Sequence, residues 1–248
     1  MKDNFSAQAS IYAQFRPGYP AQLFDFLYDQ CEVYDCAWDC AAGNGQMAAA
    51  LAQRFRQVEA TDISEKQLAQ AIRQPNIRYS MEAAETPSFP DEVFDLVVVG
   101  QAAHWFDLDT FYRQADRMLK PGGVLALVGY NLLRIDAATD ALIDQFYTGV
   151  LGKYWDAERR LVDEAYAGLP FPFPEIGFPE MFMQYEWSVD HLLGYLNTWS
   201  ALQHYVRENG RSPLDEAFLS ELRTVWPKET AKTVRFPIFW RIGRKDRS

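Results

Sequence analysis

A glycine-containing loop lies between the first predicted strand of the chain and the helix after it. The loop region occupies residues 38–45, with the sequence WDCAAGNG. Glycines at such a point let the backbone approach a bulky ligand, and the free amides at the start of a helix favour hydrogen-bond acceptors. Asp62 ends the second predicted strand, where an acid can accept hydrogen bonds from both hydroxyls of a ribose. The loop and the acid together predict a nucleotide-like ligand.

The loop does not follow the full dinucleotide pattern. In the motif G-x-G-x-x-G the third glycine would fall at position 48, which is Ala48. Some dinucleotide sites accept alanine there, so this residue counts against NAD without excluding it. No tyrosine is followed four positions later by lysine, so the Tyr-x-x-x-Lys pair of many nicotinamide-dependent reductases is missing. An NAD(P)-dependent oxidoreductase stays open as the alternative.

The elements that position these residues alternate between strand and helix from residue 20 to residue 130. A capping box at residues 64–67 (SEKQ) starts one helix, and residues 121–123 (PGG) are expected to end another. Alternation of this kind favours an open, doubly wound, mostly parallel α/β sheet, with ligands at the carboxyl ends of the strands. Apolar runs predict strands over residues 34–40, 58–61, 76–81, 95–100 and 124–130.

The pattern changes after residue 130. One or two helices are expected within residues 131–180, followed by a segment, GLPFPFPEIGFPE, too rich in proline for a regular element. No linker interrupts the chain, so residues 1–248 are interpreted as one domain. We expect a ligand-binding core over 1–130, an inserted cap over 131–180, and closing strands and helices over 181–248. The closing strands are predicted over residues 181–187 and 233–242, and the helices over 191–207 and 214–225.

Composition and charge exclude several classes of protein. Of the 248 residues 48% are hydrophobic, which is enough to bury a full core and excludes a disordered chain. The balance of 24 basic against 34 acidic residues gives a net charge of −10, so no general attraction to nucleic acid or anionic membranes is expected. No segment approaches the ~20 apolar residues of a membrane span. The aromatic share of 15% is high and suits a core or a ligand pocket.

The three cysteines are close together in the sequence. Cys31, Cys36 and Cys40 are odd in number and have no further cysteine as a partner, which disfavours a secreted disulfide framework. A metal site built on them lacks a nearby fourth ligand, so no metal is expected. We interpret them as reduced, buried thiols of a cytoplasmic protein.

The chain resembles the class I S-adenosylmethionine-dependent methyltransferases, and within them the small-molecule enzymes of the trans-aconitate methyltransferase-like (type 11) group. The resemblance covers nearly the whole chain. WDCAAGNGQ is similar to the first motif of that family, with Ala41 in place of its usual first glycine. The other matching segments are residues 12–20 (YAQFRPGYP), 60–64 (ATDIS), 84–107, 119–127 (LKPGGVLAL) and 197–205 (NTWSALQHY).

The resemblance implies a fold and a cofactor. The expected fold is a Rossmann-like, seven-stranded, mostly parallel sheet with an antiparallel last strand and an inserted helical cap. The expected cofactor is S-adenosylmethionine, with Asp62 on its ribose and Ile63 on its adenine. Arg16 would pair with its carboxylate and, with Tyr12, close over it. The remaining cofactor-binding residues that the resemblance implies are Asp39, Gly43 and Gly45 around the methionine part, Ala84 and Glu85 at the adenine edge, and Gln101 near the transferred methyl group.

The same resemblance places His104 and Trp105 beside the reacting atoms. A protonated His104 could orient an acceptor carboxylate, a neutral one could remove a proton from a hydroxyl, and a structural one would bond the surrounding loop. Trp105 fits a pocket wall or the core equally well. We therefore expect methyl transfer to a carboxylate or hydroxyl oxygen of a small molecule. Candidates to line the acceptor pocket are Tyr147, Tyr154, Trp155, Trp199, His204 and Tyr205, although aromatic residues at this spacing more often form core.

Two further alternatives concern the acceptor and the activity. Base-amino methyltransferases carry an Asn/Asp-Pro-Pro-aromatic motif after the fourth strand, whereas residues 100–103 are GQAA. With the negative net charge, this argues against a nucleic-acid substrate. A non-catalytic S-adenosylmethionine-binding module stays open, as does the choice between monomer and homodimer.

Overall fold

The centre of the protein is a strand covered on both faces. β4 (Phe94–Gly100) has the sequence FDLVVVG, and its first six residues are buried. It pairs in parallel with β1 (Cys36–Cys40) on one side and β5 (Leu119–Tyr130) on the other. β1 pairs in parallel with β2 (Gln57–Asp62), and β2 with β3 (Ile77–Met81). The computed structural model, which describes residues 15–247, thus contains the parallel sheet that the apolar runs predict.

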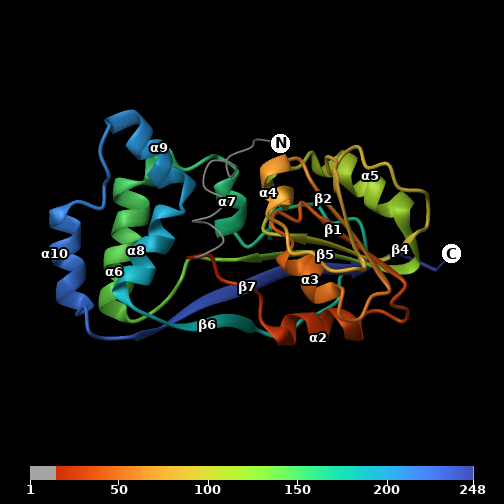
Figure 1. Ribbon diagram of the computed structural model, residues 1–248, viewed down its shortest axis with the longest axis horizontal. Coiled ribbons are helices and arrows are strands. Elements are labelled where there is room, and N and C mark those ends of the chain that lie inside the picture. Colours follow the sequence, from red (N-terminus) through yellow and green to blue (C-terminus); the bar gives the residue numbers. More distant parts are fainter. Residues whose placement is uncertain (1–14, 248) are drawn as a thin grey trace.

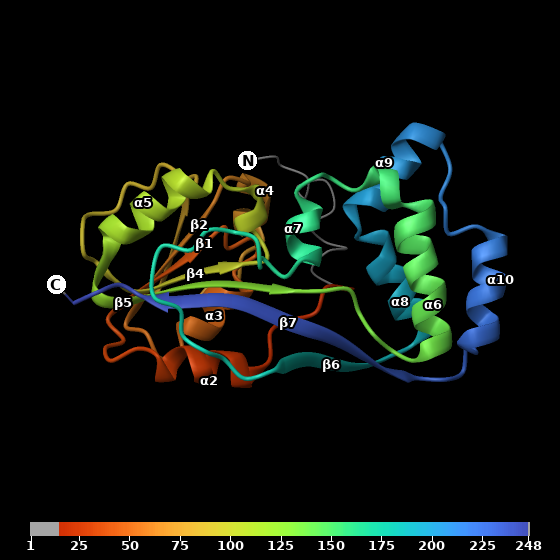
Figure 2. The same ribbon diagram turned by 180° about the vertical axis from the view of Figure 1, so that it is seen from behind.

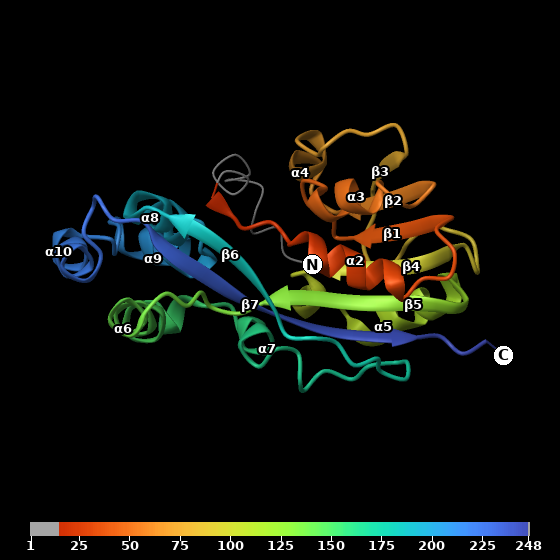
Figure 3. The ribbon, with the colours of Figure 1, turned by 90° about the horizontal axis from the view of Figure 1, so that it is seen from below.

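Two more strands complete the sheet. β7 (Lys232–Arg244) lies between β5 and β6 (Met181–Trp187) and is antiparallel to both. The strand order is β3-β2-β1-β4-β5-β7-β6, and Figure 3 shows β3, β2, β1, β4 and β5 following one another. The expected fold class is confirmed: the sheet has seven strands, is mostly parallel, and its last strand in the chain is antiparallel. The order reverses direction between β1 and β4, which is the switch point at which open α/β sheets bind ligands.

Helices cover both faces of the parallel part of the sheet (Figure 1). α2 (Ala21–Asp29) and α3 (Gln46–Leu51) share one apolar cluster with the sheet, and α5 (Leu108–Met118) lies in a second cluster on the opposite face. α4 (Glu65–Ala69) contacts β2 and β3. The clusters are separated by the sheet because successive side chains of a strand point to opposite faces.

The remaining helices gather beyond one end of the parallel sheet, where β5, β7 and β6 extend past it (Figure 2). Most buried residues of this helical region continue the apolar cluster that holds α2 and α3, whereas Val162 belongs to the cluster on the α5 face. The proposed division of the chain at residues 130 and 180 stays a prediction. The elements of the region are α6 (Ala137–Gln145), a π-helical turn (Phe146–Val150), a 3-10 turn (Gly152–Tyr154), α7 (Arg159–Asp163), α8 (Val189–Asn197), α9 (Ser200–Asn209) and α10 (Glu216–Val225).

The structure corrects two element boundaries. The helix expected over residues 191–207 is two helices, because the Thr198 hydroxyl donates to the Tyr195 carbonyl oxygen (2.6 Å) and Trp199 takes an extended conformation. The helix expected to end at the PGG segment ends earlier, at Met118, and PGG lies inside β5. Within residues 15–247 no helix has the length and apolar character needed to cross a membrane.

Candidate active site

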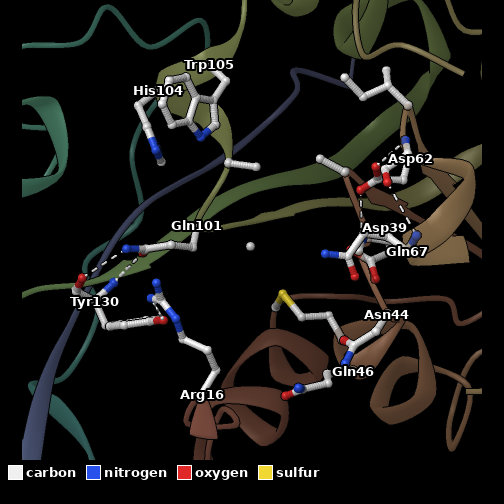
Figure 4. Close-up of a pocket in the computed structure, with 18 of the residues that line it drawn as sticks. Arg16, Asp39, Asn44, Gln46, Asp62, Gln67, Gln101, His104, Trp105 and Tyr130 are labelled. Atoms are coloured by element: carbon white, nitrogen blue, oxygen red, sulfur yellow. Dashed lines mark hydrogen bonds between the residues drawn. The ribbon is translucent and has the colours of Figure 1, made fainter. Parts of the chain in front are cut away.

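A pocket of about 190 Å³ opens at the carboxyl ends of β1, β2 and β4 (Figure 4). One wall carries Asp39 and Asp62. The opposite wall carries Gln101 and His104, which follow β4 in the chain. This is the place that the strand order predicts for a ligand. Of the predicted site residues, the pocket brings together Arg16, Asp39, Gly43, Asp62, Ile63, Gln101, His104 and Trp105.

The loop after β1 has backbone angles that favour glycine. Gly43 and Gly45 have φ angles of +56° and +79°, and Ala41, where the related motif usually has glycine, has +59°. A Cβ on Gly43 would meet no atom within 4 Å, so this position is open toward the pocket. A Cβ on Gly45 would instead lie 2.1 Å from the Tyr79 hydroxyl. Gly45 therefore allows close packing on β3 and is not among the residues that line the pocket.

Backbone amides hold the Asp62 carboxylate in place. Its Oδ2 accepts from the Gly43 amide at 2.9 Å, and its Oδ1 accepts from the Ser64 amide at 2.8 Å. Ser64 caps α4 by accepting from the Gln67 amide at 3.3 Å. The predicted capping box is confirmed in part. The Ser64 side chain caps the helix, but the Ser64 amide donates its hydrogen bond to Asp62. A carboxylate can accept about four hydrogen bonds, so Asp62 in this orientation can also receive hydroxyl groups of a ligand.

Asp39 is a buried acid in the same wall. Its side chain accepts from the Ala48 amide at 2.8 Å, and the residue is only 1% exposed. Burial raises the pKa of Asp39 to about 7, with a smaller increase from the charge of Asp62 and an opposing effect of the Ala48 hydrogen bond. Two carboxyl groups in one wall make this side of the pocket attractive to a cationic group such as an ammonium.

Gln101 joins the ends of β4 and β5 through its side chain. Its Oε1 accepts from the Tyr130 amide at 2.8 Å, and its Nε2 donates to the Tyr130 carbonyl oxygen at 3.2 Å. Its backbone amide donates to Val128, and its φ of +52° is unusual for a residue with a side chain. Gln101 lines the pocket, but both ends of its amide already bond the backbone.

Arg16 is bonded to the chain beside the pocket. Its Nη1 donates to the Tyr130 hydroxyl at 3.0 Å, and its Nη2 donates to the Thr198 carbonyl oxygen at 3.3 Å. Its guanidinium also lies over the ring of Tyr195, 5.3 Å from the centroid. Arg16 therefore links the end of β5 to the junction between α8 and α9, and pairing with a ligand carboxylate would compete with these contacts.

His104 lies in the short 3-10 turn Ala103–Trp105 after β4. Its Nδ1 is 2.8 Å from the Tyr166 hydroxyl, and the imidazole contacts the ring of Trp105. Burial, together with a smaller effect of the positive charge of Arg159, lowers the pKa of His104 to about 3. The imidazole is thus neutral near pH 7, so the protonated form that could orient a carboxylate is disfavoured. Its partner is the Tyr166 side chain and not the backbone of the loop.

Some predicted residues lie elsewhere. Ala84 is buried in the core cluster of the α5 face, and Glu85 accepts from the Asp107 amide at 3.1 Å. Neither is among the pocket-lining residues that the structure describes, and Tyr12 lies outside the described residues. The candidate acceptor-pocket aromatics are also absent from the lining; several stack on one another, as with Tyr147 and Trp155 at 4.6 Å. Five of the six pack in or against the apolar core, and His204 bonds the Tyr154 carbonyl oxygen.

The cysteines form no metal site within residues 15–247. Cys31, Cys36 and Cys40 are buried and unpaired, and no group of three histidine, cysteine, aspartate or glutamate side chains there is arranged to hold a metal ion. Burial raises the pKa of both the Cys31 and Cys36 thiols to about 12. These thiols are therefore poor nucleophiles at neutral pH.

Several lining residues were not predicted. Asn44, Gln46 and Met47 continue the glycine loop into α3, so their proximity to the motif was the available signal. Arg159 reaches the pocket from α7, far along the chain and outside any recognised motif. The other additional lining residues are Pro17, Tyr19, Ala41, Ala42, Ser64, Gln67, Ala102, Tyr130, Asp156 and Ser200.

Known proteins resemble this chain in sequence and in fold. Residues 38–127 match a family described as a methyltransferase domain. The chain is similar to a solved structure from Anaeromyxobacter dehalogenans, named as a type II methyltransferase, with 40% identity, a TM-score of 0.86 and coverage of 93% of this chain and 98% of that one. A Dictyostelium discoideum protein named as a methyltransferase is 29% identical, over 98% of this chain and 95% of its own length. A structure from Bacillus halodurans, 20% identical with a TM-score of 0.52, covers 92% of this chain and 100% of its own and shares the fold.

Proposed function

This chain belongs to the class I S-adenosylmethionine-dependent methyltransferases, and on that premise we propose that it methylates a carboxylate or hydroxyl oxygen of a small organic molecule. When bound, S-adenosylmethionine would supply an electrophilic methyl group that the acceptor oxygen could take, with the electron pair of the C–S bond left on sulfur. The chain's own residues then have two tasks: they bind the cofactor on one wall and hold the acceptor in line on the other.

The carboxylates and the open glycine on the wall near β1 and β2 support the assignment of S-adenosylmethionine as the cofactor. Asp62, held by the amides of Gly43 and Ser64, would accept hydrogen bonds from the ribose hydroxyls. The open Cα of Gly43 provides room for the bulk of the cofactor. Asp39 would attract the ammonium of the methionine part. These residues therefore match both the ribose hydroxyls and the ammonium group of an adenosyl amino acid.

The neutral state of His104 supports an oxygen acceptor that needs little help from a base. A group with a pKa near 3 is a weak proton acceptor at neutral pH. A carboxylate requires no deprotonation before it attacks, so positioning in a water-poor pocket can supply much of the catalysis. His104 and Trp105 would then position the acceptor by packing against it, and His104 would not remove a proton from it.

The charge and the cysteines support the remaining parts of the proposal. The net charge of −10 disfavours a nucleic-acid substrate. Three unpaired thiols are typical of a reducing compartment, so we place the protein in the cytoplasm. Whether it acts as a monomer or a homodimer stays a prediction.

The single observation that carries the proposal is the meeting of Asp62, the glycine loop and His104 in one pocket. It is tested by incubating the protein with S-adenosylmethionine and panels of carboxylic acids, alcohols and phenols. We expect a one-methyl mass gain in an acid or a hydroxyl compound, and equal formation of S-adenosylhomocysteine. Turnover confined to amines or thiols would contradict the oxygen acceptor. A boiled-protein control removes non-enzymatic methylation.

A further inference from the structure

Hydrogen bonds hold the guanidinium of Arg159 at its Nε atom. Its Nε donates to the Tyr147 hydroxyl at 2.8 Å and to Asp163 Oδ1 at 3.1 Å. The Tyr147 hydroxyl donates to Asp163 Oδ1 at 2.8 Å, and the Trp155 ring centroid lies 5.1 Å from the guanidinium carbon. Tyr147 comes from the π-helical turn Phe146–Val150, a type of element that is frequent at functional sites. These contacts aim the side chain without using its two terminal nitrogens.

Arg159 is a mostly buried residue of the pocket lining. The side chain is only 20% exposed, and the residue lines the pocket together with His104 and Trp105. Among residues 15–247, neither Nη1 nor Nη2 has a hydrogen-bond partner. The charge is felt inside the pocket, since it contributes to lowering the pKa of His104. A guanidinium held in this way presents two parallel donors to a ligand.

We propose that Arg159 determines acceptor specificity by binding a carboxylate of the methyl acceptor through Nη1 and Nη2. The proposal rests on the proposed function and narrows its substrate class to carboxylic acids. The planar fork of arginine matches the two oxygens of a carboxylate, and paired N–H···O bonds of this kind are strong and directional. Because Nε is already bonded to Tyr147 and Asp163, the carboxylate would bind to Nη1 and Nη2.

The distribution of charge in the pocket favours this orientation. Asp39 and Asp62 lie on the cofactor wall and would repel an anion there (Figure 4). The other charged residues of the lining are Arg16, Arg159 and Asp156. Arg16 lies on the side of Gln101 (Figure 4), and the charge of Arg159 acts on His104. Because both Nη atoms of Arg16 bond Tyr130 and Thr198, Arg159 is the cation whose fork is available. One such fork suits a carboxylate monoanion better than a phosphate dianion, which binds several donors.

The test measures binding without turnover. The protein is saturated with S-adenosylhomocysteine and titrated with a panel of aliphatic, aromatic and dicarboxylic acids, each beside its neutral amide and beside inorganic phosphate. Binding is followed by tryptophan fluorescence, because Trp105 lines the pocket and Trp155 stacks on Arg159. We expect acids to bind at least about tenfold more tightly than their amides and than phosphate, as charge-assisted hydrogen bonds predict.

The variants separate specific recognition from general effects. Arg159→Gln should weaken acid binding about tenfold or more, and Arg159→Lys, which keeps the charge without the fork, should give an intermediate value. Arg160→Gln is the matched control: Arg160 is the next residue on α7, its side chain is 76% exposed, and it does not line the pocket. It should bind acids like the wild type. S-adenosylhomocysteine affinity should be unchanged in all three variants, which also shows that they fold.

The possible failures are distinguishable. If the wild type binds no S-adenosylhomocysteine, the proposed function fails. If it does bind, the carboxylate proposal is overturned when no acid in the panel binds, when acids and amides bind alike, when phosphate binds more tightly, or when Arg159→Gln retains acid binding. Methyl transfer to neutral alcohols by a protein that ignores acids would keep the oxygen acceptor and reject the role of Arg159.

Discussion

The side-chain amide of Gln101 pairs with both backbone groups of Tyr130. The two hydrogen bonds, of 2.8 and 3.2 Å, extend the β4–β5 pairing by one step with a side chain in place of a peptide. The backbone amide of Gln101 still bonds Val128, and at this residue the chain turns, with φ +52°, into the loop that carries His104 and Trp105. This contact positions the side of the pocket that faces the glycine loop.

Removing the Gln101 side chain should loosen this junction. Gln101→Ala loses both hydrogen bonds and keeps a Cβ at positive φ, so we expect a loss of about 1–3 kcal/mol in the free energy of unfolding. Gln101→Gly loses the same bonds but relieves the backbone strain, so it should be about 1 kcal/mol more stable than the alanine variant. Urea denaturation measures both. Equal stability of alanine variant and wild type would show that the amide contributes nothing.

The two loop glycines should respond differently to alanine. Both have positive φ, but only at Gly45 would a Cβ collide, with the Tyr79 hydroxyl at 2.1 Å. Gly45→Ala should therefore lower the unfolding free energy well beyond the ~1 kcal/mol strain expected for Gly43→Ala. Gly43→Ala should mainly weaken cofactor binding. Thermal unfolding of both, and of Gly45→Ala combined with Tyr79→Ala, isolates the collision; no recovery in the double variant would contradict it.

Local patterns were sufficient to predict the central sheet. The FDLVVVG run of β4 is apolar on both faces, and Asp62 directly ends a strand, so both strands and the position of the acid could be predicted from adjacent residues. At the break between α8 and α9 the hydroxyl and the amide of Thr198 both bond the Tyr195 carbonyl oxygen, and Trp199 is extended. Helical periodicity continues through that point, so the break could not be anticipated.

The acceptor side of the pocket depends on tertiary packing. Arg159 reaches it because Tyr147 and Asp163 orient its Nε, and these residues come from different turns of the inserted region. No spacing rule connects such residues to His104. The same packing explains why the aromatic candidates Tyr147 and Trp155 lie in the core beside Arg159 instead of lining the pocket.

The neutral His104 should affect stability at acid pH. Its pKa is lowered from 6.5 to about 3 in the folded state, so below pH 6.5 the unfolded chain takes up a proton that the folded chain does not. Stability is therefore lost as pH falls from 6.5 toward 3, by at most about 1.4 kcal/mol per pH unit. Unfolding of wild type and His104→Asn, compared between about pH 7 and about pH 5, should show a smaller acid loss in the variant. Parallel curves would contradict burial of a neutral imidazole.

Asp39 should behave in the opposite sense. Its pKa is raised from 3.8 to about 7, so between these values the folded chain binds the extra proton and stability falls as pH rises. Asp39→Asn keeps an oxygen for the Ala48 amide and removes this loss, so its stability relative to wild type should grow between about pH 5 and about pH 8. The variant should also bind S-adenosylmethionine more weakly, because it lacks a charge for the ammonium. A pH-independent stability difference would contradict the raised pKa.

The central claim is that Asp62 and the glycine loop hold S-adenosylmethionine, and calorimetric titration tests it most directly. Wild-type protein should bind S-adenosylmethionine and S-adenosylhomocysteine in preference to NAD. Asp62→Ala should weaken both by more than ~1 kcal/mol, because two hydroxyls lose their acceptor, whereas the exposed control Asp91→Ala should bind as the wild type does. Binding of NAD with neither adenosyl compound bound, or unchanged affinity in Asp62→Ala, would contradict the account.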